Sequence, residues 1–292
     1  MMKSEVYKKH NKGFIVVGGS KCGTTSIYFY LKNHPDICLT KIKETFFFGK
    51  RKPSRIKNYL MENEYSSLFS DCSGKSIRGE VSGAYLNTYS ASKIKEKLGN
   101  TKIIVVLRNP VERIFSMYRY KCSMREYRGD IKSFTGLIKS LDFYTPAISE
   151  YFRLFGKENV LILRFEDLIA DPKAFFTEFY EFIGIRKLFF EFEMVNRTML
   201  FKNSLLQRIY TFFFNKLSLG AYMMCMKKSP KKALLMFYGK YFNGSLFHKR
   251  LFDFLEKRSL NIRLSDEEKE YLSEIYRDDI IKLNELLGRK VY

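Results

Sequence analysis

The fold of this chain is decided by the stretch FIVVGGSKCGTT at residues 14–25. Residues 14–18 are apolar, largely β-branched and end in glycine, which is typical of a buried strand before a tight turn. A helical pattern then runs from Thr24 to Lys32. The stretch therefore predicts a strand, a glycine-rich turn and a helix in direct succession.

Further apolar segments of strand length lie at Ile77 to Val81, Ile103 to Leu107 and Val160 to Arg164. Segments with helical spacing separate or follow them, at residues 91–98, 111–124, 146–155 and 173–183. Strands that alternate with helices favour a parallel sheet that is covered on both faces. We therefore expect an α/β protein with a three-layer, P-loop-like fold, in which helices flank a central parallel β-sheet.

The scarcity of residues that mark linkers indicates the domain organisation. Six prolines and no Gly/Ser-rich linker occur in 292 residues, so we expect one domain over residues 1–292. The C-terminal third, about residues 200–292, is more basic and aromatic, and Ser265-Asp266-Glu267-Glu268 predicts the start of a final amphipathic helix that ends near Leu287. We expect this third to be mainly helical, to cover the sheet and to shape an acceptor cleft.

The formal net charge of +21 predicts attraction to anions, such as a phosphate-rich nucleotide, an acidic glycan, a membrane surface or nucleic acid. Charge alone does not choose among these partners, and solvated surface lysines explain it equally well. The stretch from Phe212 to Phe242 is rich in Phe and Met and is more often core than ligand surface. Because Lys227-Lys228 and Lys231-Lys232 lie within it, peripheral contact with an acidic membrane stays open.

Compartment is predicted from the N-terminus and the cysteines. The first thirteen residues are polar and basic and lead into an apolar strand that is too short for a signal-peptide core. The five cysteines are odd in number and show no CxxC pairing. We expect reduced thiols and a cytoplasmic protein without a membrane anchor.

The pattern Gly18-x4-Gly23-Thr24-Thr25 has the spacing of a phosphate-binding loop, except that the lysine has moved to Lys21. Glycines let backbone N–H groups turn toward an anion, and the N-terminus of the following helix adds to the attraction. A tight turn that binds nothing is the alternative for this pattern alone.

A second segment places Arg108 at the end of the strand at residues 103–107, and a helix that begins near Pro110 places Ser116 two turns further on. In a metal-dependent nucleoside triphosphatase, an aspartate at such a strand end would help to hold Mg²⁺. Arginine instead makes paired, charge-assisted hydrogen bonds to phosphate. This indicates a donor that is bound without a metal.

Together these two segments strongly resemble sulfotransferases that use 3′-phosphoadenosine-5′-phosphosulfate (PAPS), particularly the branch of heparan-sulfate sulfotransferases and their bacterial relatives. The resemblance spans most of the chain. Further segments that carry it are His34-Pro35-Asp36, Lys43-Glu44-Thr45-Phe46-Phe47-Phe48, Gly79-Glu80-Val81-Ser82, Leu163-Arg164-Phe165-Glu166-Asp167-Leu168 and Leu286-Leu287-Gly288-Arg289.

The resemblance implies how the donor is held. Arg108 and Ser116 would bind the 3′-phosphate, and the basic residue Arg197 is a further candidate from the C-terminal loop of the family. The product would be 3′-phosphoadenosine 5′-phosphate (PAP), and no metal is expected. The 5′-phosphosulfate would be bound by the residues Lys21, Cys22, Gly23, Thr24, Thr25 and Ser26.

By the same resemblance Glu44 is the general base, and Lys21 stabilises the oxygens of the leaving phosphate. From the residues alone, Glu44 would be an ordinary surface carboxylate. Glu80 is the second candidate for the base, or a residue that fixes the loop by hydrogen bonds. Some relatives carry a lysine just after this glutamate, whereas Val81 stands here, so a second catalytic lysine is not expected.

These observations predict an enzyme that transfers a sulfuryl group from PAPS to a hydroxyl or amine of an acceptor, either a carbohydrate or glycoconjugate or a small molecule. No specific nucleic acid partner is expected. A metal-dependent P-loop kinase and a non-catalytic polyanion-binding protein are the alternatives. No feature of the sequence indicates the acceptor, the sulfated position or the oligomeric state.

Overall fold

The structure is a computed structural model, and it describes residues 13–50, 65–69, 72–138, 143–192, 194, 198–211, 254–255 and 257–292. The chain forms two compact units: unit 1 comprises Met1–Arg113, Ser140–Asn196 and Leu272–Tyr292, and unit 2 comprises Ile114–Lys139 and Arg197–Tyr271. Helices α5 (Pro110–Ser123) and α14 (Asp266–Leu287) each pass from one unit into the other. The single domain predicted over residues 1–292 stays a prediction.

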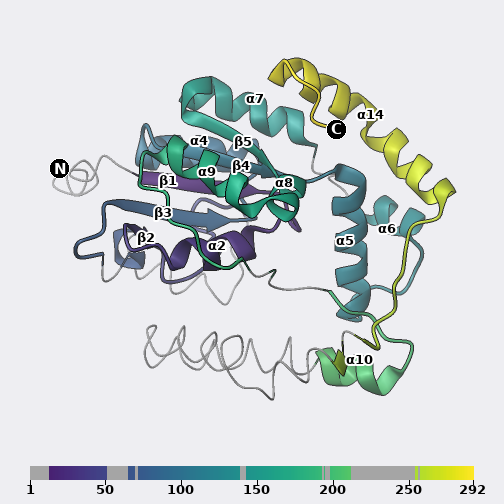
Figure 1. Cartoon of the computed structure of the whole chain (residues 1–292). Coiled ribbons are helices and arrows are strands. Elements are labelled where there is room, and N and C mark those ends of the chain that lie inside the picture. Colours follow the sequence, from purple (N-terminus) through teal and green to yellow (C-terminus); the bar gives the residue numbers. More distant parts are fainter. Residues whose placement is uncertain are drawn as a thin grey trace. The chain divides into compact units, whose positions relative to one another are not determined.

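Unit 1 contains a five-stranded parallel sheet (Figure 1). The order across the sheet is β2-β3-β1-β4-β5, so β1 lies between β3 and β4. Because the strands are parallel, the residues that follow β1, β3 and β4 meet at the same edge, where α/β proteins commonly bind ligands. In chain order the strands are β1 (Gly13–Gly18), β2 (Ile37–Leu39), β3 (Ile77–Ser82), β4 (Lys102–Leu107) and β5 (Val160–Arg164).

The two faces of the sheet are covered by different helices. Along β1, Phe14 and Val16 belong to one apolar core, whereas Ile15 and Val17 belong to the other, as the two-residue period of a strand requires. This arrangement confirms the predicted layers of a central parallel sheet flanked by helices. The first core takes residues from α2 (Thr24–Lys32), α8 (Phe165–Ala170) and α9 (Pro172–Ile183), and the second from α4 (Thr88–Leu98), α7 (Tyr144–Phe155) and α14.

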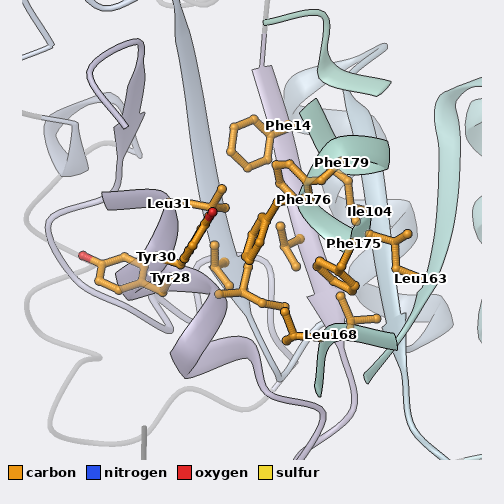
Figure 2. Packing of buried hydrophobic residues seen from close by; sticks show 14 of the residues in the cluster. Phe14, Tyr28, Tyr30, Leu31, Ile104, Leu163, Leu168, Phe175, Phe176 and Phe179 are labelled. Carbon is orange, nitrogen blue, oxygen red and sulfur yellow. The ribbon is translucent and has the colours of Figure 1, made fainter. Parts of the chain in front are cut away.

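The first core is rich in aromatic residues (Figure 2). Phe14 on β1 meets Phe179 on α9 edge to face, with ring centroids 5.5 Å apart, and Tyr30 on α2 stacks on Phe176 at 3.7 Å. Such pairs add about 0.5–1.5 kcal/mol each beyond the burial of their area. The packing holds α2 against β1 and α9, and it therefore fixes the turn from which α2 begins.

The strands predicted at residues 77–81, 103–107 and 160–164 are confirmed to within one residue. Helix α4 begins at Thr88, three residues before its predicted start at Ala91, because Asn87 caps it and accepts a hydrogen bond from the Ser90 N–H at 2.9 Å. Strand β2 and helix α8, with three and six residues, were not predicted because such short elements leave little periodic signal.

Unit 2 contains α6 (Ile131–Leu137), α10 (Ser204–Thr211) and the first residues of α14. Ser265 and Glu268 cap α14 reciprocally: the Ser265 N–H donates to Glu268 at 2.8 Å, and the Glu268 N–H donates to the Ser265 hydroxyl at 3.1 Å. This confirms the helix start predicted at residues 265–268. A small core of unit 2 contains Met199, Phe201, Tyr210 and Leu255.

Residues 212–253 lie outside the described residues. The Phe- and Met-rich stretch from Phe212 to Phe242, with its lysine pairs, falls within this range, so the predicted acceptor cleft stays a prediction. In the part of the chain that the structure describes, no helix is both long and apolar enough to cross a membrane.

The prediction that all cysteines are reduced is wrong for one pair. Cys38 on β2 and Cys72 shortly before β3 form a disulfide, with Cα atoms 5.4 Å apart. The pair is separated by 34 residues, and pairing over such a distance depends on which strands become neighbours, a property that spacing does not reveal. Cys22 and Cys122 are free thiols, and Cys225 lies outside the described residues.

Candidate active site

The glycine turn, residues 18–23, connects β1 to α2 at the edge where the parallel strands end. The turn is closed by a hydrogen bond from the Cys22 N–H to the Gly19 carbonyl at 3.3 Å. Gly23 precedes the helix with φ of 75°, and a Cβ there would lie 2.7 Å from the Phe165 ring. Only glycine therefore fits at this position. No side chain caps α2, so its first N–H groups are oriented for an anion.

Within this turn, Lys21 has φ of 72°, an uncommon value for a non-glycine residue. Burial raises the pKa of the Cys22 thiol to about 11, so Cys22 is a neutral thiol and not a nucleophile near neutral pH. Thr24 and Ser26 are buried, Thr25 is half-buried, and the Ser26 hydroxyl lies 3.3 Å from the sulfur of Met194. The turn therefore presents mainly backbone groups and one lysine.

Arg108 lies directly beside this turn, because β4 pairs with β1 so that Val106 is opposite Gly18. Its Nη1 donates to the Lys21 carbonyl oxygen at 3.1 Å, and its guanidinium carbon lies 4.8 Å from the centroid of Phe165. The side chain is 19% exposed. The structure thus brings together the two segments on which the predicted donor site depends.

The turn after β4 is itself held in place. The Tyr144 hydroxyl donates to the Arg108 carbonyl oxygen at 2.7 Å, and the Asn109 N–H donates to Glu166 Oε1 at 2.8 Å. Glu166 therefore fixes a turn and does no chemistry in this arrangement. Both contacts limit the motion of Arg108 relative to the glycine turn.

Two predicted donor residues are not placed at this site. Ser116 lies on α5 within unit 2, whereas Arg108 belongs to unit 1. Arg197 lies outside the described residues. Their contribution to the 3′-phosphate site stays a prediction.

Glu44 lies near the first turn of α2. Its Oε1 accepts hydrogen bonds from the Gly83 N–H at 3.1 Å and from the Lys43 ammonium at 2.5 Å. A Cβ built on Gly83 would lie 3.1 Å from that oxygen and 3.2 Å from the hydroxyl of Thr24. The carboxylate and the first turn of α2 therefore approach the same point, and 27% of the Glu44 side chain stays exposed. Glu44 is thus not an isolated surface residue.

Glu80, the second candidate for the base, is fully buried. It accepts hydrogen bonds from the hydroxyls of Thr45 at 2.6 Å, Tyr65 at 2.8 Å and Tyr85 at 2.9 Å. Burial raises the pKa of the Glu80 carboxyl, and hydrogen bonds from the three hydroxyls and from the backbone of Thr45 oppose that rise only in part. A carboxylate enclosed in this way cannot meet an acceptor directly.

Sequence reasoning missed Arg113, a fully buried arginine on α5. A Cβ on Gly19 would lie 3.1 Å from its Nη1, and its guanidinium lies 5.1 Å from the centroid of the Tyr144 ring. It adds a positive charge on the inner side of the glycine turn. The only available signal was its place five residues after Arg108, which does not show that its side chain turns back toward β1.

His34 has a structural role. Its Nδ1 accepts from the Asp36 N–H at 3.1 Å, so its Nε2 carries the proton and donates to the Arg186 carbonyl oxygen at 3.1 Å. Burial lowers the pKa of His34. This pair of bonds ties the end of α2 to the segment after α9 and leaves the ring no part in catalysis.

The comparisons with known proteins agree with this geometry. The family model described as "Sulfotransferase domain" matches residues 11–203, which is more than half of the chain. The chain therefore belongs to the sulfotransferase family.

Two curated members of this family are similar to part of the chain. The chain is 36% identical over 109 residues to the membrane-associated sulfotransferase kil1 of Dictyostelium discoideum, covering 37% of this chain and 22% of that protein. It is 27% identical over 187 residues to the human heparan sulfate glucosamine 3-O-sulfotransferase 3B1, covering 60% of this chain and 46% of that protein. The chain thus spans less than half the length of these curated relatives.

A solved structure shows the fold. The sulfotransferase from Alicyclobacillus acidocaldarius matches with a TM-score of 0.63 and 20% sequence identity, covering 96% of this chain and 97% of that chain. The predicted three-layer P-loop-like fold is therefore confirmed.

Proposed function

We propose that this protein transfers a sulfuryl group from PAPS to a hydroxyl or amine of an acceptor, and that the acceptor is a carbohydrate or glycoconjugate. One observation carries the proposal: Arg108 contacts Lys21 at 3.1 Å while the Glu44 carboxylate approaches the first turn of α2. Cations for a bisphosphorylated nucleotide and a carboxylate for an acceptor thus lie at one edge of the sheet. The similarity to a heparan sulfate glucosamine 3-O-sulfotransferase supports the acceptor class.

The donor side would act through backbone groups and cations. The N–H groups of the glycine turn and of α2 would bind the 5′-phosphosulfate, with Lys21 on its oxygens. A guanidinium has five N–H donors, so the bond from Arg108 to Lys21 leaves donors for the 3′-phosphate. Ser116 and Arg197 are proposed to complete that phosphate site, and no metal is proposed.

The acceptor side would act through Glu44. As the acceptor oxygen or nitrogen attacks sulfur, its proton passes to the Glu44 carboxylate and the bond between sulfur and the 5′-phosphate oxygen breaks. The electron pair of that bond stays on the phosphate of PAP, where Lys21 and the turn N–H groups stabilise the charge. The new sulfate ester or sulfamate and PAP are the products.

The decisive experiment measures transfer of radiolabelled sulfate from PAPS to an array of glycans and small alcohols, in parallel with transfer from ATP and Mg²⁺. We expect sulfated product from PAPS alone. Activity only with ATP and Mg²⁺ would support the kinase alternative. Salt-sensitive DNA binding without affinity for PAP would support the polyanion-binding alternative.

Glu44→Gln tests the base in the same assay. We expect transfer to fall by about 10²–10⁴-fold while PAP affinity stays near that of the wild type, because a general base acts on the acceptor and not on the nucleotide. Glu96→Gln is the matched control, since Glu96 is a half-exposed carboxylate that pairs with Lys93 on α4. If Glu44→Gln retains full activity, the base is another residue.

The cytoplasmic location also remains a proposal, and the Cys38–Cys72 disulfide speaks against it, since disulfides persist mainly in oxidising compartments. Alkylation of thiols in freshly lysed cells, followed by reduction and a second label, distinguishes the cytoplasm from an oxidising compartment. Labelling of both cysteines before reduction supports the cytoplasm, and labelling only after reduction supports an oxidising compartment.

A further inference from the structure

The buried carboxylate of Glu80 is not explained by the proposed chemistry. It lies on the interior strand β3, is fully buried, and its partners in the described part of the chain are three hydroxyl groups and the backbone of Thr45, all of them neutral. Burying a carboxylate costs free energy, and neutral hydroxyls compensate for lost water less fully than a cation would. An apolar residue would fill such a core position at lower cost, so the network calls for another explanation.

The network ends on one short segment, the Glu44 turn, residues 44–48. Thr45 and Tyr85 both donate to Glu80 Oε1. The same two hydroxyls accept from the backbone: Thr45 Oγ1 from the Phe47 N–H at 3.1 Å, and the Tyr85 oxygen from the Phe48 N–H at 3.4 Å. Two hydroxyls therefore connect the charge of Glu80 to consecutive N–H groups of this turn.

The backbone of the Glu44 turn needs such support. Glu44 and Phe46, the two neighbours of Thr45, have φ of 61° and 55°. Non-glycine residues are uncommon in this region, and the conformation persists only where surrounding contacts determine it. Thr45 lies between the two strained residues, is fully buried, and is held by Glu80 at 2.6 Å.

Both ends of this arrangement belong to β3 and the residues just after it. Glu80 lies on β3, and Gly83, whose N–H donates to Glu44 at 3.1 Å, directly follows the strand. One rigid element thus holds the backbone after Glu44 through Glu80 and the carboxylate of Glu44 through Gly83. These two attachments, together with the ion pair to Lys43, set the direction of the Glu44 side chain.

We propose that Glu80 is a positioning residue for sulfuryl transfer, and that it acts through the hydroxyls of Thr45 and Tyr85 to hold Glu44 toward the first turn of α2. This inference rests on the proposed function, since it assigns Glu44 as the base. It gives the second candidate for the base a role that involves no contact with substrate. A displacement of about 1 Å at a catalytic group can cost about 10²-fold in rate.

A pair of tyrosine variants tests the proposal. Tyr85→Phe removes a hydroxyl that links Glu80 to the Phe48 N–H, whereas Tyr65→Phe removes a hydroxyl that donates to the other oxygen, Oε2. Both variants delete one oxygen beside the same carboxylate and keep the ring. We expect Tyr85→Phe to lower kcat about tenfold and Tyr65→Phe to leave it within about twofold of the wild type.

Thr45 supplies a second, independent pair. Thr45→Val removes the hydroxyl at nearly constant volume, and Thr45→Ser retains it. We expect Thr45→Val to lower kcat about 10–100-fold, with PAP affinity by calorimetry unchanged, and Thr45→Ser to restore most of the rate. All rates are divided by the folded fraction, so a purely structural role would not change them.

The outcomes are distinct. Equal kcat for Tyr85→Phe and Tyr65→Phe, or unchanged kcat for Thr45→Val, overturns the positioning role while the proposed function stands. A wild-type chain that transfers nothing from PAPS overturns both. Should Thr45→Val fail to fold, the tyrosine pair still decides.

Discussion

The donor side and the acceptor side of the candidate site are built from different materials. On the donor side, two interior strands, β1 and β4, end in a glycine turn and an arginine, and the contacts are backbone N–H groups and cations. On the acceptor side, Glu44 lies on a segment that follows the short edge strand β2, and buried side chains fix its position.

This difference separates binding from turnover. On the donor side, a substitution that changes the backbone of the turn or removes one of its cations should lower nucleotide affinity. On the acceptor side, the removal of one hydroxyl from the network should lower the rate of transfer while the nucleotide still binds. Variants on the two sides should therefore differ in which quantity changes.

On the donor side, the largest expected effect is at Lys21. We expect Lys21→Ala to lower the transfer rate by about 10²–10³-fold, because the cation stabilises charge that develops on the leaving phosphate. Unlike Glu44→Gln, it should also weaken PAP binding. Lys93→Ala is the control, since Lys93 is a half-exposed lysine on α4 that pairs with Glu96. Unchanged PAP affinity in Lys21→Ala would remove the distinction between the two sides.

The next largest effect is on stability, at Gly23. We expect Gly23→Ala to lower the free energy of unfolding by about 3 kcal/mol and to weaken PAP binding, because the new Cβ would meet the Phe165 ring at 2.7 Å. Gly184→Ala is a matched control: its φ of 72° is similar, but no atom lies within 4 Å of the new Cβ. There we expect a loss of about 1 kcal/mol, measured by urea unfolding. Equal losses would show that the contact with Phe165 relaxes freely.

Arg108 sharpens the assignment of the two phosphates. We expect Arg108→Ala to weaken PAP binding by about 10–100-fold, since a charge-assisted hydrogen bond contributes about 1.5–3 kcal/mol. Adenosine 5′-phosphosulfate lacks the 3′-phosphate, so its binding should change little in the same variant. Calorimetry with both nucleotides gives the comparison. An equal loss for the two nucleotides would place Arg108 at the other phosphate.

The smallest effect concerns pH and His34, which ends the α2 segment and leads into β2. Burial lowers the pKa of His34 in the folded state. The unfolded chain, in which the pKa of His34 has its ordinary value of about 6.5, therefore binds the proton more tightly than the folded chain does. The stability that His34 contributes is present above that value and is lost as pH falls through the folded pKa. Urea unfolding of wild type and His34→Gln from about pH 8 to pH 5 should therefore converge at low pH. Parallel curves would contradict this assignment.

The two sides also differ in how far the sequence predicts them. The glycine turn was predicted because strand, turn and helix are local, and local residues determine them. Its proximity to Arg108 follows from β1 and β4 being neighbours in a parallel sheet. Glu44 was identified only through family resemblance, because its position depends on Thr45 and Glu80, two residues that are 35 positions apart.

Other features escaped prediction for the same reason. Arg113 is a helical residue whose side chain contacts a turn almost a hundred positions earlier in the chain. The Cys38–Cys72 bond spans 34 residues. Local patterns carry no information about such contacts, and the helices and strands must first be assembled.

The Cys38–Cys72 bond affects how far the length of the segment that it encloses can vary. The segment begins on β2 and ends shortly before the neighbouring strand β3, and the Glu44 turn lies near its beginning. For a loop closed in this way, doubling its length costs only about 0.6 kcal/mol. Insertions after the Glu44 turn should therefore cost little stability, because the disulfide keeps the two ends of the enclosed segment together whatever its length.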